Sequence, residues 1–226
     1  MKRISKLIFL ALISFALVGC GTSIMNATKS QQSSEKALVI IDVPTTTSLI
    51  DVKKALKEAI AHRSQSFQEK TNFLPSDLPE KPAEPNFNGK TIFGRGLMAM
   101  AAGNPQFEMM RTDVTNSYYN LSGTEEFGSV FAKKMMAYIG ALYPAKSINR
   151  VYLVVYFQEG TSGITGNIAK AVADSIVGAK GAIPFMLQVK EKFLEYIPEG
   201  KIVGVQPIEL NDVVLTKFNT VTTKEN

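Results

Sequence analysis

Histidine and cysteine, two residue types that often act in catalysis or bind metals, are scarce in this chain. The sequence has one histidine, His62, and one cysteine, Cys20, so neither an intramolecular disulfide nor a cysteine-cluster metal site is possible. A histidine can act as a general base or a metal ligand. His62, however, lies beside Arg63 at the end of an amphipathic stretch, where the helix dipole favours a cation. We interpret it as a surface or capping residue, and the sequence predicts no catalytic residue, metal or cofactor.

Two carboxylates are candidates for a binding site. Asp42 and Glu159 lie at the carboxyl ends of the two most apolar strand-like runs, where ligands bind in open α/β sheets. If these strands are parallel neighbours, both carboxylates face one crevice, and Thr45, Thr46 and Thr47 add hydroxyls to it. Paired carboxylates serve in acid–base chemistry or bind a cation. The alternative is that these are ordinary charged residues that emerge from a core.

Three evenly spaced glycines form a second candidate. Gly160, Gly163 and Gly166 follow a strand-like run and precede a helix-like one, which is the setting of a phosphate-binding loop. Their spacing matches neither the dinucleotide-binding nor the P-loop pattern, although Lys170 is close in sequence. Turn formation is the simpler interpretation, and an anion site is the alternative.

Apolar periodicity indicates the elements that must position these residues. The runs typical of strands are 37–43, 150–159 and 201–209, and further candidates for strands are 91–93, 107–121 and 212–218. Helical spacing is found over 48–63, 166–178 and 183–197, and in a stretch that begins at Thr124 and ends at Pro144. The stretch 72–89 contains four prolines, which favours an extended surface loop, and the polar end 219–226 is expected to fray. We therefore predict a single domain over 37–218, of α/β or α+β class, with a mixed β-sheet packed against three to four amphipathic helices.

Three local signals sharpen this prediction. Ser48 and Asp51 have the spacing of a capping box at the start of the first helix. The run 150–159 is apolar on both alternating faces, so we expect it to be covered on both sides of the sheet. Pro207 cannot donate a ladder hydrogen bond, which places the strand 201–209 at or near an edge.

A methionine-rich cluster lies between the proline-rich stretch and the next element. Its members are Leu97, Met98, Met100, Phe107, Met109 and Met110. Thioether side chains adapt to irregular surfaces and suit partner binding, but core packing is the simpler interpretation.

The start of the chain has the features of a secretory signal. Lys2, Arg3 and Lys6 precede the apolar run from Leu7 to Val18, which only Ser14 interrupts. The run is too short to span a bilayer comfortably, because about 20 apolar residues are needed.

The segment Leu17-Val18-Gly19-Cys20 resembles the lipobox of bacterial lipoproteins. The resemblance implies that the Cys20 thiol receives a diacylglycerol and that the lipoprotein signal peptidase cuts between Gly19 and Cys20. Residues 1–19 are then a signal peptide, and 20–36 are the lipidated cysteine and a polar, flexible tether. Gly21 stands where an aspartate often directs inner-membrane retention, so the resemblance favours the periplasmic face of the outer membrane in a Gram-negative source.

Charge and composition limit the classes of partner. Without the leader, the chain has 22 basic and 20 acidic residues, and no basic run that would bind nucleic acid. The sequence favours a non-enzymatic binding or envelope-assembly module that is held on the membrane by its lipid and contacts an envelope protein, a glycan or another subunit. One alternative is a small hydrolase or ligand-binding enzyme that uses a crevice at Asp42, Thr45 and Glu159. Another is a lipid or small-molecule carrier with a cavity lined by Phe107, Met109 and Tyr138.

Overall fold

The computed structural model describes residues 34–89, 104–129, 132–158 and 181–215. The predictions for Gly19, Cys20, Glu159, Gly163 and Gly166 lie outside these residues and stay predictions. The same holds for the strand 91–93, the helix 166–178 and the end 219–226.

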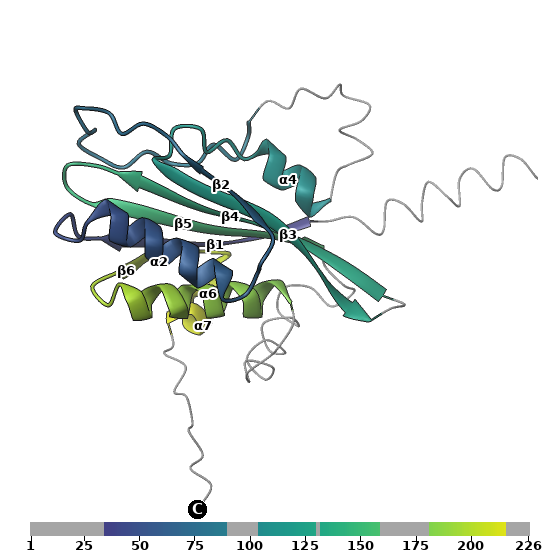
Figure 1. The fold of residues 1–226 in the computed structure, drawn as a ribbon. Coiled ribbons are helices and arrows are strands. Elements are labelled where there is room, and N and C mark those ends of the chain that lie inside the picture. The colour runs from purple at the N-terminus through teal and green to yellow at the C-terminus, as the bar shows by residue number, and fades with distance from the viewer. Residues whose placement is uncertain (1–33, 90–103, 130–131, 159–180, 216–226) are drawn as a thin grey trace, which may run out of the picture. The chain divides into compact units, whose positions relative to one another are not determined.

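Six strands form one antiparallel sheet in the described part of the chain (Figure 1). They are β1 (Ser34–Val43), β2 (Phe67–Thr71), β3 (Tyr119–Ser129), β4 (Ala132–Pro144), β5 (Asn149–Gln158) and β6 (Lys201–Gln206), in the spatial order β2-β3-β4-β5-β1-β6. Each neighbouring pair is antiparallel, whereas a mixed sheet was expected. With its helices this sheet makes a single α+β domain, which confirms the fold class and narrows it.

Helices cover the two faces of the sheet unequally. On one side, here called the helix face, α2 (Leu49–Ala61) and α6 (Ala182–Tyr196) pack against the sheet. A 3₁₀ turn (Ile208–Leu210) and α7 (Asn211–Leu215) add Leu210 and Val214 to that core. The other side, here called the loop face, is covered by the short helix α4 (Pro105–Arg111) and by the proline-rich stretch 72–89 (Figure 1). None of the described helices is long and apolar enough to cross a bilayer.

Several predicted elements are confirmed. The Ser48 side chain accepts a hydrogen bond from the Asp51 backbone N–H at 3.1 Å, so the expected cap starts α2. His62 is the exposed C-cap of that helix, as expected. The predicted helix 183–197 corresponds to α6, and the stretch 72–89 contains no helix or strand beyond one isolated bridge.

Strand β5 is buried on both faces, as its sequence indicates. Val151, Leu153, Val155 and Phe157 belong to the core of the helix face, and Tyr152, Val154 and Tyr156 belong to that of the loop face. Strand β6 lies at an edge of the sheet, as expected, but the expected bounds 201–209 are wrong. The strand ends at Gln206, Pro207 lies outside it, and residues 208–210 form a 3₁₀ turn.

The helix expected between Thr124 and Pro144 is wrong, because these residues form the β3–β4 hairpin. Met136, Tyr138 and Leu142 face the helices, and Ala137, Ile139 and Ala141 face the other side. A strand that is apolar on both faces also has apolar residues at intervals of three and four. Periodicity therefore could not separate the two structures, and long-range pairing with β5 decided between them.

Three further boundaries differ from the expectations. The strand expected over 107–121 is mostly wrong: α4 occupies its start, with Asn104 as cap (its Oδ1 accepts from the Gln106 N–H at 2.9 Å), and β3 begins only at Tyr119. The strand expected at 212–218 is helical over its described start, in α7. Strand β1 begins at Ser34, so the tether ends earlier than the expected residue 36.

Candidate functional site

The structure does not form the expected crevice at Asp42. Strands β1 and β5 are antiparallel, so Asp42 lies opposite Arg150, whereas Gln158 lies opposite Ser34 at the other end of β1. The premise of parallel neighbours is therefore wrong. The Arg150 guanidinium donates to both carboxylate oxygens of Asp42, at 2.6 and 2.9 Å, and the ion pair raises the pKa of Arg150.

The threonines after β1 do not complete a site with Asp42. Thr45 and Thr46 are exposed in the turn that follows the strand. The Thr47 hydroxyl donates to Glu199 at 2.6 Å. The part of the chain that the structure describes also has no group of three or more His, Cys, Asp or Glu side chains that could hold a metal ion.

The residues proposed to line a carrier cavity lie on opposite sides of the sheet. Tyr138 is buried in the helix face, and Met109 packs on the loop face. The void beside Tyr138 has a volume of only ≈ 10 Å³ and is lined by residues such as Ile60 and Phe185. A space of this size is at the lower limit for one water molecule, so the described residues beside Tyr138 leave no room for a ligand.

A larger hollow of ≈ 460 Å³ lies on the loop face, between α4 and the β2–β3 edge of the sheet. We call it the α4 groove. Its lining consists of Ser66, Phe67, Gln68, Gln106, Met109, Met110, Thr112, Val114, Ser122, Gly123, Thr124 and Ile139. Gln68 and Ile139 lie opposite Ser122 on the two neighbouring strands, which places these three residues in one row across the groove.

Glycine is required at position 123, beneath this row. A Cβ there would lie 2.3 Å from the Tyr138 hydroxyl and 2.7 Å from the Ser66 carbonyl oxygen. The Tyr138 hydroxyl reaches over Gly123 to within 2.7 Å of Ser64 Oγ and 3.2 Å of that carbonyl. These two hydrogen bonds hold the residues before β2 against β3 and β4. They lie on the helix face of the sheet, opposite the groove, and stabilise the strands that form its floor.

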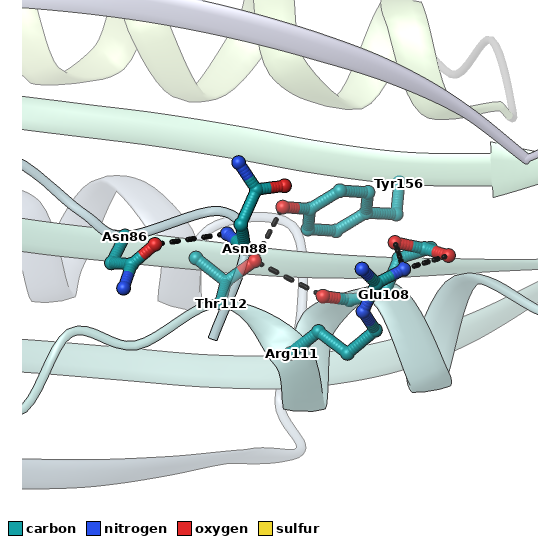
Figure 2. A network of polar contacts seen from close by, with 6 residues as sticks. All are labelled: Asn86, Asn88, Glu108, Arg111, Thr112 and Tyr156. Carbon is teal, nitrogen blue, oxygen red and sulfur yellow. Dashed lines mark hydrogen bonds and ion pairs between the residues drawn. The ribbon is translucent and has the colours of Figure 1, made fainter. Parts of the chain in front are cut away.

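A polar network fixes the other wall of the groove (Figure 2). The Thr112 hydroxyl, at the end of α4, donates to the Glu108 carbonyl at 3.0 Å and is hydrogen-bonded to the Tyr156 hydroxyl, which rises from β5. Arg111 pairs with the Glu108 carboxylate at 3.4 Å. Burial raises the pKa of Tyr156 to about 12, so its hydroxyl remains protonated at neutral pH.

Backbone hydrogen bonds also connect the two chain segments that flank this network. Asn86 and Asp113 exchange two backbone hydrogen bonds, of 2.9 and 2.8 Å, which join the proline-rich stretch to the segment after α4. The Asn86 side chain in turn accepts from the Asn88 N–H at 3.0 Å (Figure 2). The seven-residue helix α4 is thus held in two ways. The Thr112–Tyr156 hydrogen bond joins its end to the sheet, and the Asn86–Asp113 pair joins the segment after it to the proline-rich stretch.

Five polar side chains of the groove have no partner within the described chain. Those of Ser66, Gln68, Gln106, Ser122 and Thr124 form no hydrogen bond or ion pair there. None of the described lining residues is charged. The groove therefore offers hydrogen-bond donors and acceptors together with apolar contacts, and the chemistry it supports is binding.

A second hollow, of ≈ 370 Å³, lies under the proline-rich stretch on the same face. It is lined by Asn72, Phe73, Pro75, Leu78, Pro79, Ala83, Thr115, Asn116, Ser117, Tyr118, Tyr143 and Pro144. Phe73 is fully exposed at its rim. Tyr143 is 1% exposed, and its hydroxyl has no hydrogen-bond partner among the described residues.

The sequence did not identify the groove, apart from Met109 and Met110 in the methionine-rich cluster. Asn104 and Pro105 are ordinary helix-start signals that would have placed α4. Nothing local, however, brings α4 beside residues of β2 and β3. Comparisons with protein-family models, curated proteins and solved structures find no match to this chain.

Proposed function

We propose that this protein is a lipid-anchored binding module of the bacterial cell envelope, and that the α4 groove holds its ligand. The observation that carries the proposal is the set of unpaired hydrogen-bonding side chains among the described residues of the groove: Ser66, Gln68, Gln106, Ser122 and Thr124. Polar groups that converge on a preformed hollow are the common feature of ligand sites.

Two structural arguments favour binding over the alternatives. The Asp42 carboxylate is engaged by Arg150, so it is not available as the general base that a hydrolase would need. The void beside Tyr138, among the described residues of the helix face, has a volume of only ≈ 10 Å³, which is far too small for a lipid.

The membrane anchor rests on the lipobox-like residues Leu17 to Cys20. Acyl chains on Cys20 would hold the protein stably, because each buried methylene contributes about 0.8 kcal/mol and more than one chain is attached. The segment from Cys20 to Ser34, even when fully extended, can span at most about 50 Å. The groove would therefore work close to the membrane surface.

The anchor is tested by replacing Cys20 with serine. The Cys20→Ser chain should incorporate no labelled palmitate and should accumulate as an uncut precursor in cells. Normal labelling of this variant would contradict the lipid anchor.

The groove is tested by photo-crosslinking of the intact lipoprotein in cells. A photo-reactive benzoylphenylalanine in place of Met110, at the exposed rim of the groove, should give a discrete adduct on irradiation. The same residue in place of Lys54, which is exposed on α2, is the matched control and should give none. No adduct at Met110, or equal adducts at both positions, would contradict the proposal.

A further inference from the structure

None of the described residues that line the α4 groove is charged, which restricts the class of ligand. Sites for phosphates or carboxylates present Arg or Lys, and sites for cations present carboxylates. The nearest charged groups on α4, Glu108 and Arg111, pair with each other at 3.4 Å. The charge of the described lining therefore matches a neutral ligand.

The unpaired side chains lie close together in the groove, and each of them can both donate and accept hydrogen bonds. The Gln68 and Gln106 amides each have two donor hydrogens and an acceptor oxygen, and the Ser122 and Thr124 hydroxyls each donate and accept. A ligand that satisfies them must itself carry several closely spaced groups of this dual kind. Vicinal hydroxyls have this property.

An extended peptide fits this arrangement less well. A peptide strand normally pairs its backbone with the edge of a sheet. Ser122, in contrast, lies on the face of β3 at a position where that strand pairs with both β2 and β4, and Thr124 lies on the same face just beyond the end of the β2 pairing. The groups of the groove thus point out of the plane of the sheet rather than along a ladder.

The apolar part of the lining completes the match. Met109, Met110, Val114 and Ile139 offer apolar contacts beside the polar row. Met110 is 53% exposed at the rim, and a thioether adapts its shape to a C–H surface at low energetic cost. A sugar ring presents both hydroxyls and a C–H face, and the volume of ≈ 460 Å³ lies in the range of small-ligand sites.

We infer that the α4 groove binds a neutral saccharide through Gln68, Gln106, Ser122 and Thr124. The inference rests on the proposed function, because it names the ligand class of the same site. The rigid floor over Gly123 and the pinned wall at Thr112 mean that little ordering is required on binding.

The absence of tryptophan from the chain allows a direct test. A Met110→Trp substitution in the full-length lipidated protein, in a detergent without sugar groups, places a single indole at the rim of the groove. Titration with chitotriose and with maltotriose should give a saturable fluorescence change for at least one of them. A Tyr196→Trp variant, with its reporter on the half-exposed end of α6, should give none.

Substitutions identify the binding groups. Gln68→Leu and Ser122→Ala should each weaken saccharide binding about 3- to 10-fold, because each removes one or two hydrogen bonds. Asn116→Leu is the matched control: it removes an exposed amide at the second hollow and should leave the affinity unchanged. Unchanged affinity in both groove variants would overturn the assignment.

The same reporter separates the possible ligand classes. Response to trigalacturonate alone, or to a blocked neutral peptide such as acetyl-tetra-alanine amide alone, would overturn the inference of a neutral saccharide. If crosslinking at Met110 succeeds while neither saccharide is bound, the saccharide inference fails and the binding function stands. If both experiments are negative, both fail.

Discussion

The two faces of the sheet differ in how they are covered. On the helix face, α2 and α6 bury a continuous aliphatic and aromatic core, and the void beside Tyr138 among the described residues is only ≈ 10 Å³. On the loop face, a seven-residue helix and a proline-rich stretch cover the tyrosines Tyr143, Tyr152 and Tyr156, and hollows of ≈ 460 and ≈ 370 Å³ remain.

The difference follows from the covering elements. Long amphipathic helices place a stripe of side chains against a sheet at high packing density. A short helix and a segment with four prolines supply few inward side chains, so polar groups of the sheet and helix are left facing a hollow. We infer that the helix face stabilises the fold and that the loop face binds.

The largest expected effect lies on the helix face. Phe193, on α6, is fully buried, so Phe193→Ala should lower the free energy of unfolding by about 3 to 5 kcal/mol. Met110→Ala, at the exposed rim of the α4 groove, should change it by less than about 0.5 kcal/mol. Urea unfolding followed by circular dichroism measures both, and similar losses would remove the contrast between the faces.

Alkaline pH should destabilise the protein through the buried tyrosines. The pKa of Tyr156 is raised to about 12, so the native state keeps a proton that the unfolded chain loses near pH 10. Its contribution is therefore complete below pH 10 and is lost as the pH rises to 12, at about 1.4 kcal/mol per pH unit.

The Tyr156→Phe variant checks this contribution. Between pH 10 and 12 its free energy of unfolding should fall less steeply with pH than that of the wild type. Parallel curves in urea unfolding at each pH would show that Tyr156 titrates normally.

The back of the groove provides the next test. Gly123→Ala should destabilise the protein by about 1 to 3 kcal/mol, because the new methyl group meets the Tyr138 hydroxyl at 2.3 Å. The double variant Gly123→Ala with Tyr138→Phe should recover part of that loss. Additive losses in thermal or urea unfolding would mean that the contact with the hydroxyl is not the cause.

The smallest effect is expected at Asp42. Asp42→Asn weakens the two hydrogen bonds with Arg150 and should lower the free energy of unfolding by about 1 kcal/mol. Photo-crosslinking at Met110 should be unaffected by it. Loss of the adduct in a folded Asp42→Asn protein would restore Asp42 as a binding residue and weaken the role of the loop face.

Elements with one dominant local pattern could be predicted from the sequence. The cap at Ser48 and the apolar stripe after it define α2, and the double-sided run 150–159 defines β5. The stretch 124–144 could not be assigned in this way, because its apolar residues satisfy both helical and strand spacing. Only its register with β5, which joins Met136 to Phe157 and Pro144 to Asn149, selects the hairpin.

The sequence by itself contains the lipobox-like segment and indicated an α/β or α+β class, both principal helices and an edge position for the strand that begins at Lys201. These indications come from charge, periodicity, capping and proline positions, all of which act within a few residues. Tertiary structure alone decided that Asp42 meets Arg150 and that α4 lies across from Ser122 and Thr124. Such neighbours are set by strand order and antiparallel register, which depend on packing between segments far apart in the chain.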